Sequence, residues 1–197
     1  MYKVLCRDHF QKYVPRDGII LDLAAGYCEF INNINARGKI AVDINPDVRR
    51  YAAPGVKAVL SSSTDMKAVD DSSIDIVFAG NFFEHLTKED IVKTMSEIHR
   101  VLKDDGKVMI LQPNIRFCYK DYWMFFDHVS PLDDRSMREA LEINGFKVIE
   151  CIPRFLPYTT KSMLPKSLFL LRLYIRVPLL WRIFGSQAFI LAGKTQN

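Results

Sequence analysis

Short apolar runs of strand length alternate with stretches of helical spacing along most of this chain. Residues 19–23 follow Gly18 and contain a single polar residue, Asp22, a composition typical of a strand buried on both faces of a parallel sheet. Similar runs recur at residues 39–43, 56–60, 74–79 and 107–112. This alternation predicts βαβ units with right-handed crossovers, and therefore ligand binding beyond the carboxyl ends of the strands.

The segments between and after these runs complete a doubly wound α/β pattern. A helix is compatible with the segment between the first two strands, and the length of 197 residues predicts one domain, spanning 1–197. Apolar residues make up 49% and charged residues 25%, the mixture of a soluble globular protein. By periodicity and stop signals, the remaining helices are predicted at 4–14, 88–102 and 136–144, and the remaining strands at 146–152 and 188–192.

The cysteines and the first residues bear on location and on metal binding. Four cysteines are scattered, with no C-x-x-C pair and no histidine at metal spacing, so the sequence indicates neither a disulfide framework nor a metal site. Charges interrupt the first ten residues, where a signal peptide needs an apolar stretch. We therefore expect a cytoplasmic protein.

Small residues follow the first strand. Ala24, Ala25 and Gly26 stand where a backbone must approach a ligand closely and lead into a helix N-terminus. Tight packing between strand and helix also selects small residues, so this loop alone is weak evidence for a cofactor site.

Acidic residues follow the second and third strands. Asp43 ends the second strand about 20 positions beyond the first loop, where a carboxylate can accept both ribose hydroxyls of a nucleoside. Asp65 offers an acceptor for an adenine amine, and Met66 offers a backbone contact and an apolar wall. Helix capping at Asp43 and a plain surface turn at Asp65 are the alternatives.

The fourth strand ends in a crowded polar segment. Gly80 is followed by Asn81, Phe82, a carboxylate and an imidazole, and polar groups gathered at the carboxyl end of a strand indicate a site.

Taken in order, these segments resemble the class I S-adenosylmethionine-dependent methyltransferases. Residues 20–30 are similar to the first motif of that family, 41–46 to its acidic second motif, 64–66 to its adenine-binding third and 74–86 to its fourth. Residues 97–107 are similar to the helix, turn and fifth strand that follow in members acting on small molecules. The resemblance implies a Rossmann-like, doubly wound sheet of seven strands, mostly parallel with an antiparallel last strand.

The resemblance also implies S-adenosylmethionine as the cofactor and a role for each matched position. The implied contacts are Asp22, Ala24, Ala25 and Gly26 with the methionine end, Asp43 with the ribose, Ile44, Asp65 and Met66 with the adenine, and Asn81 and Phe82 near the sulfonium.

Two positions depart from the family pattern. Ala24 and Cys28 stand where the family usually has glycines. A methyl group at Ala24 is tolerable if its φ is negative, although it narrows the room for the methionine end.

Methyl transfer from a sulfonium needs alignment more than a dedicated catalytic residue. For a hydroxyl acceptor a general base helps, and the candidates are His85, Asp127 and His128, with a structural hydrogen-bonding role as the alternative for each histidine. Residues 112–114 are expected to face the same cleft. The aromatic run at 117–126 predicts either an acceptor pocket wall or core.

A basic apolar insert is predicted at about 154–186, between the last two strands. From Cys151 onward the chain has seven Lys or Arg and no acidic residue, which indicates a local anionic partner or a solvated basic edge more than a nucleic-acid-binding protein. Three arginines and Pro178 interrupt residues 167–184, so we expect a substrate cap or homodimer contact ahead of peripheral membrane binding, and no membrane span.

The predicted function is methyl transfer from S-adenosylmethionine to a small-molecule acceptor, with a saccharide or lipid-linked acceptor as the hypothesis that reconciles the basic and apolar features. Two alternatives remain. A nicotinamide-dependent oxidoreductase would need G-x-G-x-x-G where this chain has A-A-G-Y-C-E. An inactive methyltransferase-like binding or regulatory protein would account for Ala24 and Cys28.

Overall fold

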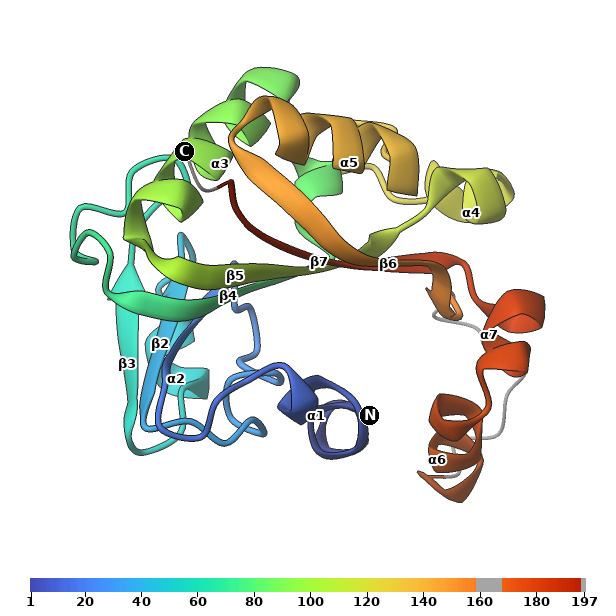
Figure 1. Cartoon of the computed structure of the whole chain (residues 1–197), viewed down its shortest axis with the longest axis horizontal. Coiled ribbons are helices and arrows are strands. Elements are labelled where there is room, and N and C mark those ends of the chain that lie inside the picture. The colour runs from blue at the N-terminus through green and yellow to red at the C-terminus, as the bar shows by residue number, and fades with distance from the viewer. Residues whose placement is uncertain (159–167, 196–197) are drawn as a thin grey trace.

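A computed structural model of the protein describes residues 1–158 and 168–195. Its seven strands form one sheet in the order β3-β2-β1-β4-β5-β7-β6 (Figure 1). Neighbours from β3 to β5 pair in parallel, whereas β7 is antiparallel to both β5 and β6, so the predicted fold class is confirmed. The strands are β1 (Ile19–Leu23), β2 (Gly38–Asp43), β3 (Val56–Leu60), β4 (Ile74–Gly80), β5 (Leu102–Pro113), β6 (Phe146–Leu156) and β7 (Gln187–Lys194).

Helices cover both faces of this sheet (Figure 1). One face carries α1 (Tyr2–Asp8), the 3-10 turn η1 (Phe10–Lys12), α2 (Val48–Tyr51), α6 (Leu168–Arg176) and α7 (Pro178–Phe184). The other face carries η2 (Phe83–His85), α3 (Lys88–Val101), α4 (Ile115–Tyr122) and α5 (Asp134–Ile143).

The alternation of side chains along each strand divides the core into two layers. In β1, Ile20 packs in the layer under α1, whereas Leu21 and Leu23 pack in the layer under α3. Asp22 therefore lies on the α1 face, at the carboxyl end of the strand.

The helix predicted between β1 and β2 is wrong, because residues 24–34 form turns. Cys28 adopts a positive φ of 57°, which interrupts a right-handed helix. Single helical hydrogen bonds remain, such as Asn32 N to Cys28 O at 3.0 Å. The segment is held instead by Phe30, whose ring stacks on Phe78 of β4 at 3.7 Å between centroids.

The described part of the basic apolar insert includes two short helices, α6 and α7, which are separated at Val177. α6 packs against α1, with Arg172 Nε 3.8 Å from Asp8 Oδ2. Trp181 of α7 donates to the carbonyl of Tyr174 of α6 at 2.8 Å. Among the residues that the structure describes, no helix has the length and apolar character needed to cross a membrane. Of the insert, residues 159–167 lie outside the described residues.

Candidate active site

The loops after β1 and β2 meet at the carboxyl edge of the sheet. The Gly26 amide donates to Asp43 Oδ2 at 2.8 Å, and the Ala25 amide donates to the carbonyl of Val42 at 3.1 Å. The other carboxylate oxygen of Asp43 accepts from Asn45 N at 2.7 Å. The structure therefore brings the first two predicted motifs into direct contact.

The first loop has a glycine-like backbone at three positions, and only one of them is a glycine. Ala24 has φ 54°, Gly26 has φ 50° and Cys28 has φ 57°, all in the left-handed region. The condition that Ala24 has a negative φ is thus not met. Its left-handed backbone costs about 1–2 kcal/mol, because the Cβ lies too close to a carbonyl oxygen. A Cβ added at Gly26 would meet no atom within 4 Å, so open space lies beside this residue.

Asp22 is a buried carboxylate on the α1 side of this loop. Asp22 is only 3% exposed, and its Oδ2 accepts a hydrogen bond from Ile31 N at 3.2 Å. Burial raises the pKa of Asp22 to about 8, and the nearby charge of Asp43 adds to that rise, whereas the bond from Ile31 opposes it. A cation beside Asp22 would lower this pKa, because it would stabilise the ionised carboxylate.

Tyr2 of α1 also reaches this site, and sequence reasoning missed it. A Cβ added at Gly80, at the end of β4, would lie 3.3 Å from the Tyr2 hydroxyl. Burial raises the pKa of Tyr2 above its usual range, and the charges of Asp22, Glu29 and Glu84 add to the rise. Aromatic residues ahead of the first strand were the available signal, but their spacing indicated only a helix.

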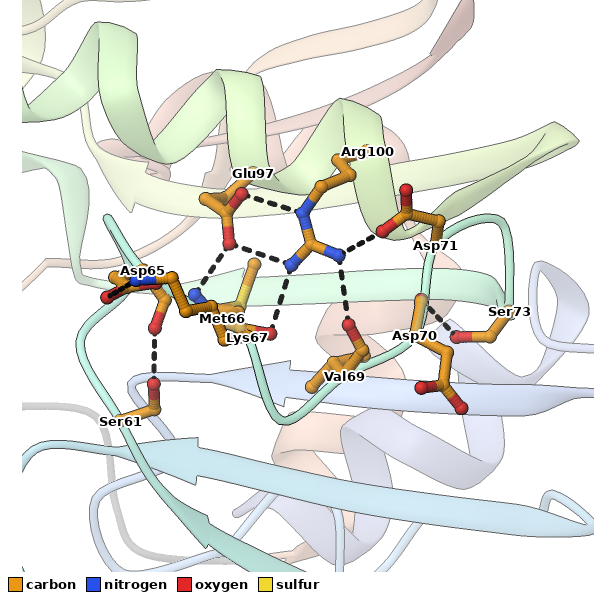
Figure 2. Close-up of polar contacts among 10 residues, drawn as sticks. All are labelled: Ser61, Asp65, Met66, Lys67, Val69, Asp70, Asp71, Ser73, Glu97 and Arg100. Carbon is orange, nitrogen blue, oxygen red and sulfur yellow. Dashed lines mark hydrogen bonds and ion pairs between the residues drawn. The ribbon is translucent and has the colours of Figure 1, made fainter.

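The third motif is held by α3, and the role predicted for Met66 is wrong. The Met66 side chain is fully buried in the core, and its amide donates to Glu97 Oε2 at 2.6 Å (Figure 2). Arg100 donates to the Met66 carbonyl at 3.0 Å and also to Glu97, Val69 and Asp71. Neither the backbone N–H nor the side chain of Met66 is left for a ligand.

The residues nearest the end of β3 are Ser61 and Ser62. Ser61 N donates to the carbonyl of Asp43 at 3.0 Å, which extends the β2–β3 pairing, and the Ser61 hydroxyl donates to the Asp65 carbonyl. The Asp65 carboxylate points to solvent and pairs with Lys67 at 3.1 Å (Figure 2). Ser62 therefore joins Asp65 as a candidate for the adenine edge.

The residues described so far at the ends of β1, β2 and β3 form what we call the β1–β3 half of the carboxyl edge. Its members are Asp22, Ala24, Ala25, Gly26, Asp43, Ile44, Ser62 and Asp65. Ile44 belongs to it, and this apolar residue is 75% exposed. Asn81 closes it from β4, where it adopts φ 51° and donates its amide to Leu111 O at 2.7 Å. Phe82, the next residue, is half-buried.

Glu84 and His85, which follow β4, and Asp127 and His128, which lie between α4 and α5, form what we call the β4–β5 half of this edge. It brings together the three predicted acid–base candidates. His85 Nδ1 lies 3.3 Å from Asp127 Oδ2, and the rings of His85 and His128 meet edge to face at 5.1 Å. Glu84 is buried beside them, and burial raises its pKa to about 8. Burial lowers the pKa of His128.

The aromatic run at 117–126 supplies both core and exposed surface. Tyr122 is fully buried and donates to the carbonyl of Ser130, and Phe125 stacks on His128 with 5.2 Å between ring centroids. The side chains that remain exposed are Tyr119, Trp123, Met124 and Phe126.

Gln112 and Asn114 are buried, so the expectation that this segment faces the cleft is wrong for both. Asn114 caps α4 and donates to Asp134 at 2.7 Å and to the carbonyl of Pro153 at 2.9 Å. The Gln112 amide is fully buried and has no hydrogen-bond partner in the described part of the chain.

The strand order and the sequence of this chain can both be compared with those of known proteins. Its strand order, with an antiparallel strand beside β5, is that of the class I S-adenosylmethionine-dependent methyltransferases and differs from the 3-2-1-4-5-6 order of nicotinamide-dependent oxidoreductases. Residues 21–110 match the family model described as a methyltransferase domain. Residues 21–110 are thus similar to a methyltransferase domain, and the whole chain has the class I methyltransferase fold, so the oxidoreductase alternative is not supported.

Similar proteins are distant in sequence. A SAM-dependent methyltransferase from Archaeoglobus fulgidus is 22% identical with a TM-score of 0.71, over 98% of this chain and 92% of that chain. A chain from a complex of the Haloferax volcanii Trm112 methyltransferase activator with a methyltransferase is 14% identical with a TM-score of 0.71, over 99% and 98%. The uncharacterized protein MJ0638 of Methanocaldococcus jannaschii is 24% identical over 139 residues, which cover 68% of this chain and 57% of that relative.

Proposed function

We propose that this protein transfers a methyl group from S-adenosylmethionine to an oxygen atom of a small-molecule acceptor. The observation that carries the proposal is the meeting of Asp22, Gly26, Asp43 and Asn81 at one edge of the sheet, beside open space at Gly26. The methyltransferase-domain match over the same strands supports it.

The β1–β3 half offers a partner for each part of the cofactor. The Asp22 carboxylate is suited to the ammonium of the methionine end, because a cation there offsets the burial that raises its pKa. The backbone of Ala24, Ala25 and Gly26 would adjoin that end. On binding, Asp43 would exchange its bond from Gly26 N for the ribose hydroxyls.

The adenine would lie against exposed Ile44, with its edge facing Ser62 and Asp65. Asn81 and Phe82 would line the space near the sulfonium, at the end of β4.

When bound, S-adenosylmethionine supplies a methyl carbon on a cationic sulfur, and transfer joins that carbon to the acceptor oxygen while the carbon–sulfur bond breaks and its electron pair stays on sulfur. His85, held by Asp127, is placed to accept the proton that leaves the acceptor hydroxyl. Tyr2, whose hydroxyl lies beside Gly80, and half-buried Phe82 would limit the access of water to the space near the sulfonium.

The acceptor we propose is a saccharide or a lipid-linked molecule. Exposed Trp123, Met124 and Phe126 directly precede Asp127 and His128 of the β4–β5 half in the chain. Arg154 connects this rim to the insert, because its guanidinium lies over the Phe117 ring at 4.7 Å and donates to Ile183 O at 2.8 Å. A rim that combines apolar side chains with arginine suits an acceptor that has both an apolar part and an anionic part.

The outer surface of the α6–α7 pair is a candidate contact for a partner. Its exposed apolar side chains are Leu168, Phe169, Leu173, Leu179, Ile183 and Phe184. A second copy, a membrane surface or an activator protein of the kind seen with the Haloferax volcanii relative would each cover it. A cytoplasmic location, supported by four free thiols, stays part of the proposal.

The strained Ala24 favours one second candidate, a methyltransferase-like protein that binds partners without catalysis. Isothermal titration with S-adenosylhomocysteine separates the two functions. We expect binding, with a rise in melting temperature at saturating ligand. Absence of binding would favour the second candidate. Radiolabelled methyl transfer to saccharide and lipid-linked acceptors then tests the acceptor class, with the Asp43→Ala protein as the control.

A further inference from the structure

Three side chains at the β4–β5 half form a group that methyl transfer alone does not explain. Glu84 and His85 come from η2, and His128 comes from the loop between α4 and α5. One donor atom from each residue lies within 4.8 Å of those of the other two. We call this group the Glu84 cluster.

Two atoms of the Glu84 cluster are buried without a partner. Glu84 is 1% exposed and His128 is 7% exposed. Glu84 Oε2 and His128 Nδ1 accept or donate no hydrogen bond within the described part of the chain, and they do not bond to each other. A buried polar atom without a partner costs about 1–3 kcal/mol, and a charged group costs more. Two such atoms on residues of one cluster indicate a further group that would satisfy them.

The surrounding contacts leave one nitrogen of each imidazole available. His85 Nδ1 is 3.1 Å from the Asp127 carbonyl and 3.3 Å from its carboxylate, which leaves Nε2. His128 Nε2 lies 3.4 Å from the Tyr158 hydroxyl, which leaves Nδ1. A carboxylate that holds the far nitrogen of a histidine is the usual support of a metal-ligating imidazole.

The cluster is also rigidly positioned. The carbonyl of Glu84 accepts from Val129 N at 2.8 Å and from Ser130 N at 3.1 Å, which ties η2 to the loop that carries His128. The Ser130 hydroxyl donates to the Leu86 carbonyl at 2.6 Å. Preorganised donors of this kind are what a cation site requires.

We propose that the Glu84 cluster binds a divalent transition-metal cation such as Zn²⁺ or Mn²⁺. Two imidazole nitrogens and one carboxylate oxygen favour such ions over Mg²⁺ or Ca²⁺, which prefer oxygen ligands. The His85 side chain is 32% exposed, so one side of the site is open. Three protein ligands with an open position are typical of catalytic metal sites.

The open position would hold an oxygen of the acceptor, a role that rests on the proposed function. A cation bound there lowers the pKa of a coordinated hydroxyl, so its proton can leave to solvent before methyl transfer. In that case His85 is a ligand and cannot also accept the proton, so the cation replaces the general base described above.

Metal binding is tested on chelator-treated full-length protein. Zn²⁺ and Mn²⁺ are titrated separately by calorimetry, and Co²⁺ is followed by its visible absorption. We expect one ion per chain, and at least tenfold weaker binding in Glu84→Gln and His128→Gln. His99→Gln, which changes a histidine beside Phe146 and outside the cluster, is the control and should bind like the wild type. If Glu84→Gln does not fold, His85→Asn replaces it, because that side chain is partly exposed.

Two results keep this inference separate from the proposed function. Equal binding of all three ions to wild type and His128→Gln would overturn the cation site. S-adenosylhomocysteine titrated into metal-free protein tests the cofactor site alone, and failure there would count against the proposed function while a bound cation still stood.

Discussion

The two halves of the carboxyl edge are built in different ways. In the β1–β3 half, the functional groups lie at the end of a strand or in the loop after it, as Asp43 is the last residue of β2. In the β4–β5 half, His128 comes from a loop far along the chain, and the hydrogen bonds of Val129 and Ser130 tie that loop to Glu84. The first half depends on strand register, whereas the second depends on tertiary packing. Substitutions in the two halves should therefore differ in how they change cofactor affinity and stability.

Asp22→Asn should have the largest effect. Loss of the buried carboxylate removes a charge-assisted contact worth about 2–3 kcal/mol, so S-adenosylhomocysteine affinity should fall about 100-fold in calorimetry. Asp75→Asn is the control, because Asp75 lies at the opposite end of the sheet, where it accepts from Ile19 N at 2.7 Å. Affinity unchanged in Asp22→Asn would contradict our placement of the methionine end.

The same variant tests the pH dependence of stability without cofactor. The folded pKa of Asp22, about 8, exceeds its usual value of 3.8, so the folded chain holds this proton more tightly than the unfolded chain. The stability that this group contributes is present below pH 4 and is lost as the pH rises through 8. Asp22→Asn should remove that decline in urea unfolding measured from pH 5 to 9.

Arg100→Ala should lower the free energy of unfolding by about 2 kcal/mol, since it removes several hydrogen bonds to charged and carbonyl groups in a partly exposed setting. It should also weaken S-adenosylhomocysteine binding, because Arg100 holds the loop after β3 (Figure 2). Arg116→Ala, which loses a 2.7 Å pair with Asp134 in the β4–β5 half, is the matched control. Arg116→Ala should lower the free energy of unfolding and leave S-adenosylhomocysteine affinity unchanged. An equal loss of affinity in Arg100→Ala and Arg116→Ala would contradict the difference that we infer between the two halves.

Asp43→Ala should weaken S-adenosylhomocysteine binding by more than about 1 kcal/mol, the scale of losing hydrogen bonds to a charged acceptor. Asp47→Ala is the control, because Asp47 is an exposed carboxylate nearby whose side chain makes no capping bond to α2. Unchanged affinity in Asp43→Ala would argue against our position for the ribose.

Ala24→Gly should have the smallest effect and the opposite sign. Relief of the left-handed strain should raise the free energy of unfolding by about 1 kcal/mol in urea titrations and strengthen S-adenosylhomocysteine binding. Ala25→Gly is the control, because Ala25 has no positive φ and a glycine there only adds chain entropy. A gain at both positions, or at neither, would show that Ala24 is not strained.

The β1–β3 half was largely predictable because strand period and motif order are local properties of the sequence. The strands and the contact between Gly26 and Asp43 follow from that pattern. Met66 was misplaced because the sequence does not show that Glu97 and Arg100, on a later helix, already occupy its backbone.

The β4–β5 half was less predictable, for a similar physical reason. His85, Asp127 and His128 were selected by residue type, but their mutual contacts depend on how the loop between α4 and α5 packs against η2. Tyr2 reaches the site only through the packing of α1 against the strands. α4 was not predicted, because the aromatic run at 117–126 indicated only a pocket wall or core.

The missing helix after β1 affects how this protein would respond to its ligand. Residues 24–34 lack a continuous backbone hydrogen-bond ladder, and a stacked Phe30 anchors them to the sheet. A segment of this kind opens at a lower free energy than the strands beside it. Deuterium uptake at these amides should therefore slow when a ligand occupies the loop, so hydrogen exchange would detect occupancy even before any acceptor is known.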